Sequence, residues 1–141
     1  MNAAEAAARL DKAMVRLYEK LSSWEDGVAD QVGLTPRQCH AVTELGEAGR
    51  IRMKPLSERL GITTGTLTVM ADRLTNLKLV QRADDPDDRR AFNIELTESG
   101  REVYRQHGRH HRRLAEELLS TLSAEEAELF IPLLERMMQV L

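Results

Sequence analysis

Residues Leu56–Leu67 read Leu-Ser-Glu-Arg-Leu-Gly-Ile-Thr-Thr-Gly-Thr-Leu, and this stretch decides the fold. Two leucines four residues apart favour a short helix over 53–60, and Gly61 ends it because glycine tolerates the left-handed backbone of a tight turn. Thr63 is placed to cap a second helix that runs to about Leu77. Its predicted inward positions are Leu67, Met70 and Leu74, with Leu77 at the end. A helix, a glycine turn and a second helix at this spacing predict a helix-turn-helix.

The residues after this motif change from a helical period to a period of two. Val80–Arg82 predicts a short strand, and Phe92–Leu96 alternates apolar and polar side chains as a second strand does. The aspartates and proline of 84–88 predict the turn between them. The result is a β-hairpin with a charged tip, so residues 54–96 predict a winged helix-turn-helix. A helix fits the major groove of DNA, and a wing can place a cation in the minor groove.

Helices are predicted on both sides of this winged segment. The first 28 residues carry a narrow apolar stripe that needs a partner helix. Thr35, Pro36 and Gln38 predict the start of the next helix, with Val42 and Leu45 inward. Thr97 would cap a long helix that ends near Leu122. Ser123 opens the last helix with a capping box, and Pro132 predicts a kink or a local break in it.

Composition narrows the class of protein. The 141 residues include 20 Lys+Arg and 23 Asp+Glu, for a net charge of −3, and a single cysteine. One cysteine excludes an intrachain disulfide framework and favours a reducing, cytoplasmic setting. No apolar run approaches the roughly 18 residues of a spanning helix, so no membrane association is expected. No GxSxG, P-loop or HExxH motif occurs, so the sequence does not predict an enzyme.

The charge is unevenly distributed along the chain. Residues 1–30 have a net charge of −2, residues 31–113 of +4 and residues 114–141 of −5. A basic middle between acidic ends indicates that the middle segment faces a polyanion.

The sequence resembles the MarR family of bacterial transcription regulators, closely over about residues 30–104. The most specific part is the wing motif Asp85–Arg90, followed by Leu96-Thr97 and Gly100. The other matching residues are Leu34-Thr35-Pro36-Arg37-Gln38, Leu56–Ile62, Thr66, Asp72-Arg73-Leu74 and Leu79-Val80. The resemblance implies an obligate dimer whose terminal helices interlock. It also implies that the DNA-binding lobes meet successive major grooves of a pseudo-palindromic operator.

The resemblance assigns DNA-binding residues by position. On the recognition helix they are Thr63, Thr64, Gly65, Thr66, Thr68 and Arg73, and on the wing Asp88, Arg89 and Arg90. Asp88 would orient Arg90 toward the minor groove, and Arg89 would meet a phosphate. Arg73 has an alternative role as a structural ion pair with Asp72. Many relatives carry Arg or Gln at the start of this helix, whereas threonine can touch a thymine methyl or a phosphate but discriminates weakly. We therefore expect specificity to depend on the wing arginine, DNA shape and half-site spacing.

Four residues are candidates for an effector or metal site, namely Cys39, His40, His107 and His111. The last two lie four residues apart on one helix face, and imidazole and thiolate are zinc ligands. A zinc-sensing branch of the family uses a histidine at the position of His40 and histidines in the fifth helix. Its ligands near the end of the first helix are not cleanly matched here, where Glu25, Asp26 and Asp30 are only nearby. The alternatives are an organic effector, acylated carrier protein as in a fatty-acid-synthesis branch, or histidines and a cysteine with purely structural roles.

The sequence thus predicts a mainly α protein with a small β-wing (α+β). It predicts one domain over 1–141, with dimerisation helices at 1–30 and 101–141 and a winged helix-turn-helix lobe at 31–100. The predicted function is a cytoplasmic homodimeric repressor that binds double-stranded DNA under effector control. No cofactor is assigned, and zinc and a small organic effector are the two candidates. The alternative is a winged-helix protein-interaction module that does not read DNA sequence.

Overall fold

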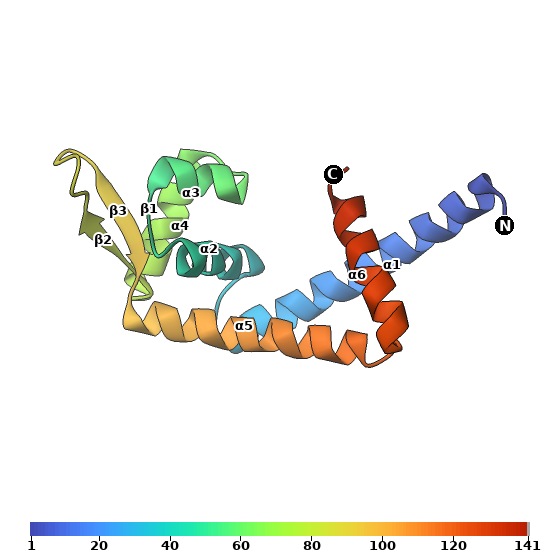
Figure 1. The fold of residues 1–141 in the computed structure, drawn as a ribbon. Coiled ribbons are helices and arrows are strands. Elements are labelled where there is room, and N and C mark those ends of the chain that lie inside the picture. Colours follow the sequence, from blue (N-terminus) through green and yellow to red (C-terminus); the bar gives the residue numbers. More distant parts are fainter. Residues whose placement is uncertain (141) are drawn as a thin grey trace. The chain divides into compact units, whose positions relative to one another are not determined.

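The computed structural model describes residues 1–140. Its elements, in chain order, are α1 (Ala3–Gln31), α2 (Pro36–Ala48), β1 (Arg50–Arg52), α3 (Met53–Leu60), α4 (Thr64–Asn76), β2 (Val80–Asp84), β3 (Phe92–Leu96), α5 (Glu98–Leu119) and α6 (Ala124–Met138). The predicted mainly α fold with a β-wing is confirmed (Figure 1). The chain forms two compact units, Met1–His107 and Gly108–Leu141. Across residues 1–140, no helix combines the length and the apolar character that crossing a membrane requires.

The predicted helix starts are confirmed because each depends on local hydrogen bonds. Thr35 and Gln38 form a complete capping box at α2, and Ser123 opens α6 in the same way. The Thr63 hydroxyl accepts a hydrogen bond from the backbone N of Thr66 at 3.1 Å. Gly61 has φ 63°, the left-handed conformation that the turn between α3 and α4 requires.

The wing contains one more strand than the sequence predicted. The sheet has the order β1-β3-β2, with all neighbours antiparallel. Arg50 pairs with Glu95, and Arg52 pairs with Asn93. The predicted two-stranded hairpin was therefore incomplete, because a three-residue strand shows no measurable period and its partner lies far along the chain.

The core of the first unit is aliphatic and lies between α2, α3, α4 and the sheet. Its most completely buried large side chains are Leu45, Leu56, Leu67, Leu74, Val42 and Cys39. Leu77, which the sequence placed at the end of this helix, has a side chain that is 51% exposed. Leu77 is the C-cap of α4, and the chain turns away at Lys78, which has φ 60°.

The second unit contains the end of α5 and all of α6. The predicted local break at Pro132 is absent from residues 124–138, where α6 continues through the proline. The helix contains no buried residue among those described, and its apolar side chains are exposed. The start of this helix at its Ser123 cap is as predicted.

Candidate nucleic-acid interface

The start of α4 is a solvent-exposed row of small polar residues. The structure places Thr63, Thr64, Gly65, Thr66 and Thr68 on the surface. Their hydroxyls already take part in local bonds. The Thr63 and Thr66 Oγ1 atoms lie 2.9 Å apart, and the Thr68 hydroxyl donates to the Thr64 carbonyl at 2.8 Å. These bonds stabilise the first turns and leave fewer hydroxyl hydrogens for an external acceptor.

Arg73 is exposed two turns further along α4. Asp72 and Arg73 are both exposed, and across residues 1–140 no ion pair between them is found. Arg73 instead shares a groove of about 350 Å³ with Arg37, which comes from the start of α2. The groove is lined by Thr35, Arg37, Gln38, Thr66, Val69, Met70 and Arg73. Arg37 was missed as a site residue, because only packing brings the start of α2 beside α4. Val69 was missed although it lies on α4 itself.

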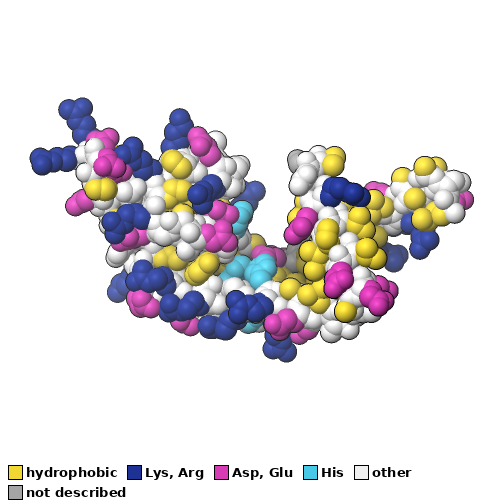
Figure 2. Space-filling model, in the orientation of Figure 1, with side chains coloured by type: hydrophobic (Ala, Val, Ile, Leu, Met, Phe, Trp, Pro, Cys, Tyr) yellow, Lys and Arg dark blue, Asp and Glu magenta, His cyan; other side chains and the backbone are white. Residues whose placement is uncertain are grey.

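The tip of the wing carries the two predicted cations. Arg89 and Arg90 are exposed, and Figure 2 shows Lys and Arg side chains projecting from the wing. Asp88 has a different role from the one predicted. Its Oδ1 accepts from the backbone N of Arg90 at 2.9 Å, so the carboxylate shapes the loop and makes no described contact with the guanidinium.

Asp85 organises the wing loop, a role that the sequence did not assign to it although it opens the wing motif. Its side chain is buried and accepts from Arg52 Nε at 2.6 Å. It also accepts from the backbone N of Asp87 at 2.9 Å, from that of Asp88 at 3.2 Å and from Asn93 Nδ2 at 3.4 Å. The Arg52 hydrogen bond, followed by the Asp87 backbone bond, lowers the pKa of Asp85 to about 2. An aspartate before proline is a known turn signal, but its arginine partner lies on β1.

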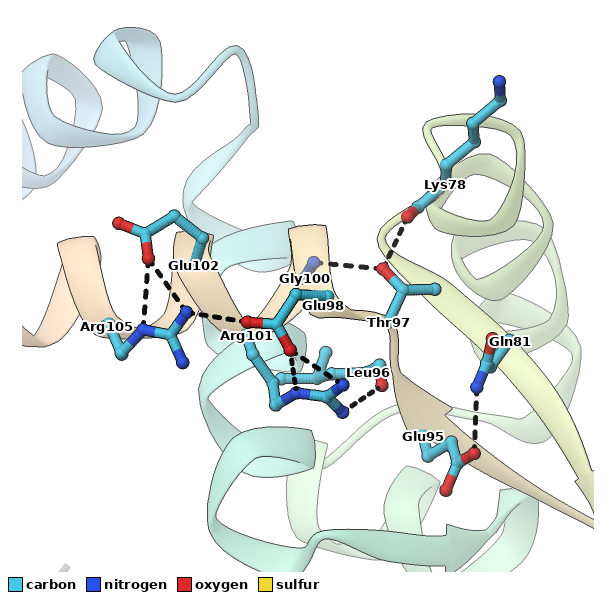
Figure 3. A network of polar contacts seen from close by, with 10 residues as sticks. All are labelled: Lys78, Gln81, Glu95, Leu96, Thr97, Glu98, Gly100, Arg101, Glu102 and Arg105. Atoms are coloured by element: carbon cyan, nitrogen blue, oxygen red, sulfur yellow. Dashed lines mark hydrogen bonds and ion pairs between the residues drawn. The ribbon is translucent and has the colours of Figure 1, made fainter.

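A polar network joins the wing to the start of α5 (Figure 3). The Thr97 hydroxyl donates to the Lys78 carbonyl at 2.6 Å and accepts from the backbone N of Gly100 at 3.1 Å. Arg101 donates to the Leu96 carbonyl at 2.9 Å. Since Lys78 directly follows α4 and its C-cap, this network ties the recognition helix, the end of β3 and the start of α5 together.

A second group of arginine bonds supports the same region. Glu98 accepts from both Arg101 and Arg105, each at 3.0 Å. On β3, Glu95 accepts from Arg50 at 2.7 Å and from Gln81 at 3.0 Å, so it bridges all three strands. The Arg50 bond, the largest cause, lowers the pKa of Glu95.

The four predicted effector residues are not gathered into one cluster. Cys39 is fully buried in the core, and burial, with a smaller contribution from Glu25, raises the pKa of its thiol to about 11. His40 is exposed, with Nε2 3.5 Å from Glu44. Among residues 1–140, no group of three metal-ligating side chains includes either of them.

His107 has a different environment. It is 6% exposed, and its Nδ1 lies 3.4 Å from the Thr43 hydroxyl. A ligand atom of Glu25, from α1, lies within 4.8 Å of a His107 ring nitrogen. His111 follows one helical turn later on α5 and is exposed. The sequence did not assign Glu25 as a ligand, because Glu25 of α1 and His107 of α5 come together only in the folded chain.

Comparison with known proteins identifies the family. The MarR family profile matches residues 34–92. The transcriptional regulator HosA of Escherichia coli O111:H- is 32% identical over 115 residues, which are 82% of this chain and 83% of that protein. The uncharacterized HTH-type transcriptional regulator YcgE of Bacillus subtilis (strain 168) is 32% identical over 98 residues, which cover 67% of this chain but only 64% of that relative.

A solved structure gives the same result for the fold. The crystal structure of Streptococcus pneumoniae FabT in complex with DNA matches with a TM-score of 0.86 and 22% identity, over 95% of this chain and 96% of that one. With HosA aligned over most of both chains and the family profile covering α2 through the start of β3, this chain belongs to the MarR family.

Proposed function

We propose that this chain is a transcription regulator that binds double-stranded DNA with sequence specificity, as a repressor under effector control. The carrying observation is the exposed start of α4 beside a wing with exposed Arg89 and Arg90. A helix start of this kind suits base edges in the major groove, and wing arginines suit the minor groove. Membership of the family and the likeness to a DNA-bound fold support the same function. In this proposal the protein is a regulator rather than an enzyme, and it acts in the cytoplasm.

The test is a gel-shift titration of the protein with the DNA upstream of its own gene, in competition with random DNA. We expect preferential binding and a steep loss of affinity as salt rises, because phosphate contacts release counterions. Equal binding to both DNAs would instead favour the alternative, a winged-helix module that docks protein. This alternative is supported by the threonine-rich start of α4, whose hydroxyls form hydrogen bonds within the helix.

The protein acts as a homodimer in this proposal. Each unit presents apolar side chains that its own residues leave exposed, which is unusual at this density for a monomer. In α1 these are Leu10, Met14, Val15, Leu17, Tyr18 and Leu21. In α6 they are Leu129, Phe130, Ile131, Leu133, Leu134, Met137 and Met138. Helices with such faces are covered by equivalent helices of a second copy. Sedimentation of the full chain at micromolar concentration would show the dimer.

A metal is one of the proposed effectors, and it is supported by Glu25 and His107. A carboxylate and an imidazole within 4.8 Å suit zinc, and His111 recurs on the same face of α5 one turn later. Cys39 does not fit this role, since its buried thiol holds its proton well above neutral pH. Zinc titration that changes neither DNA affinity nor thermal stability would leave an organic or acyl-carrier effector.

A further inference from the structure

The outward face of α4 carries one large apolar side chain. Leu67, Ala71 and Leu74 are buried and define the inward face of the helix. The residues that recur on the opposite face, all exposed, are Gly65, Val69, Asp72 and Asn76. Val69 is 59% exposed in the second turn of the helix. Packing within the chain does not explain an apolar, β-branched side chain at this exposed position.

The hydroxyls next to Val69 have little hydrogen-bonding capacity left for a base. The Thr68 hydroxyl donates its hydrogen to the Thr64 carbonyl at 2.8 Å. The Thr63 and Thr66 hydroxyls bond to each other at 2.9 Å, which uses one of their two hydrogens. A hydrogen donated within the helix is not available to a base acceptor. The threonines next to Val69 therefore offer a base their methyl groups more than hydroxyl donors.

Two cations lie beside this apolar surface. Arg37 and Arg73 line the same groove as Val69, from α2 and from the later part of α4. Both side chains are exposed. An apolar contact with two guanidinium groups in the same groove suits a DNA edge, where phosphates flank the base pairs. The apolar group that a base presents in the major groove is the 5-methyl of thymine.

We propose that Val69 determines specificity by contacting the 5-methyl group of one thymine in each half-site, while Arg37 and Arg73 hold the flanking phosphates. This inference rests on the proposed DNA-binding function and adds a base-reading residue to it. Reading by methyl contact compensates for the missing Arg or Gln at the start of α4.

The experiment removes the methyl group from each side of the contact in turn. An operator is first selected with the wild-type protein from a pool of random-sequence duplexes. Each thymine of its half-sites is then replaced symmetrically by deoxyuridine, which lacks only the 5-methyl. Dissociation constants are measured by fluorescence anisotropy at one salt concentration for the wild type, Val69→Ala and Val69→Thr. Leu77→Ala is the matched control, because Leu77 is also an exposed aliphatic residue of this segment (51%) but lies at the opposite end of α4.

The expected result is one thymine position whose replacement weakens wild-type binding by about fourfold per half-site, or about fifteenfold for a dimer. Val69→Ala should bind the thymine operator correspondingly less tightly and lose little more with deoxyuridine. Leu77→Ala should retain the full thymine preference, and Val69→Thr, which keeps one methyl and the side-chain shape, should retain part of it.

Two results would overturn the inference. If Val69→Ala shows the same deoxyuridine penalty as the wild type, the methyl is read by another residue. If no thymine position responds although the wild type selects a defined operator, only this inference fails. If the wild type selects no sequence, the proposed function fails with it, so the two failures are distinguishable.

Discussion

Two glycines of the helices give opposite predictions for the same substitution, glycine to alanine. Gly46 lies in α2, and a Cβ added there would overlap three ring carbons of Tyr104, which comes from α5. Gly108 lies inside α5, and a Cβ added there would meet nothing within 4 Å. The two sites therefore separate backbone propensity from packing.

The magnitudes follow from two competing effects. Alanine is favoured over glycine in a helix interior by up to about 1 kcal/mol. Overpacking a filled core site costs about 1–3 kcal/mol. The upper end applies at Gly46, because the overlap includes Cγ of Tyr104, so the whole ring has to move. Gly46→Ala should destabilise the protein by a net of about 2 kcal/mol, whereas Gly108→Ala should stabilise it by about 0.5–1 kcal/mol.

Urea unfolding followed by circular dichroism measures both values. The protomer concentration has to be held constant, because the proposed dimerisation would make apparent stability depend on concentration. A double-mutant cycle gives the decisive control. In a Tyr104→Ala background the overlap is gone, so Gly46→Ala should become neutral or stabilising. The reasoning is refuted if Gly46→Ala and Gly108→Ala shift stability in the same direction, or if removing the Tyr104 ring leaves the Gly46→Ala penalty unchanged.

Further predictions concern the wing and the buried thiol. Arg90→Ala should weaken operator binding, and an unchanged affinity would contradict its minor-groove contact. Arg89→Ala, at the expected phosphate contact, should reduce the salt slope by about one per wing, about two for a dimer, whereas Arg16→Ala on α1 should leave the slope unchanged; an unaltered slope for Arg89→Ala would contradict the phosphate contact. The pKa of Asp85 is about 2 in the folded chain and about 4 when unfolded, so its stabilising effect is complete above pH 4 and is lost as the pH falls toward 2. Thermal unfolding of Asp85→Asn should show a flatter decline over that acid range, and an identical pH profile for both proteins would contradict the assignment. Cys39, fully buried and with its thiol pKa raised to about 11, should react with a thiol reagent at pH 8 only after denaturant is added; labelling of the native protein at the rate of a free thiol would show that the core opens readily.

Features that depend on neighbouring residues could be predicted from the sequence. The caps at Thr35, Thr63, Thr97 and Ser123 form bonds that span three residues, so the residue types alone specify them. The left-handed turn at Gly61 is equally local. The wing motif carried the resemblance to the family because its aspartates and arginines are consecutive.

Features that join distant residues were decided only by the tertiary structure. The bond from Arg52 to Asp85 spans 33 positions, and the pairing of β1 with β3 spans 41 to 45. Neither leaves a periodic signal in the chain. The same holds for Glu25 beside His107 and for Arg37 beside Arg73.

The sequence by itself therefore determined the order of the helices, the winged helix-turn-helix and the residues exposed at the start of α4. The tertiary structure decided which acid shapes the wing, which apolar residue of α4 faces outward with cations beside it, and that Cys39 is sealed in the core. The physical reason is the separation along the chain of the residues that interact. Caps and turns are selected by bonds within a few residues, whereas burial and pKa depend on side chains that packing brings together from separate elements.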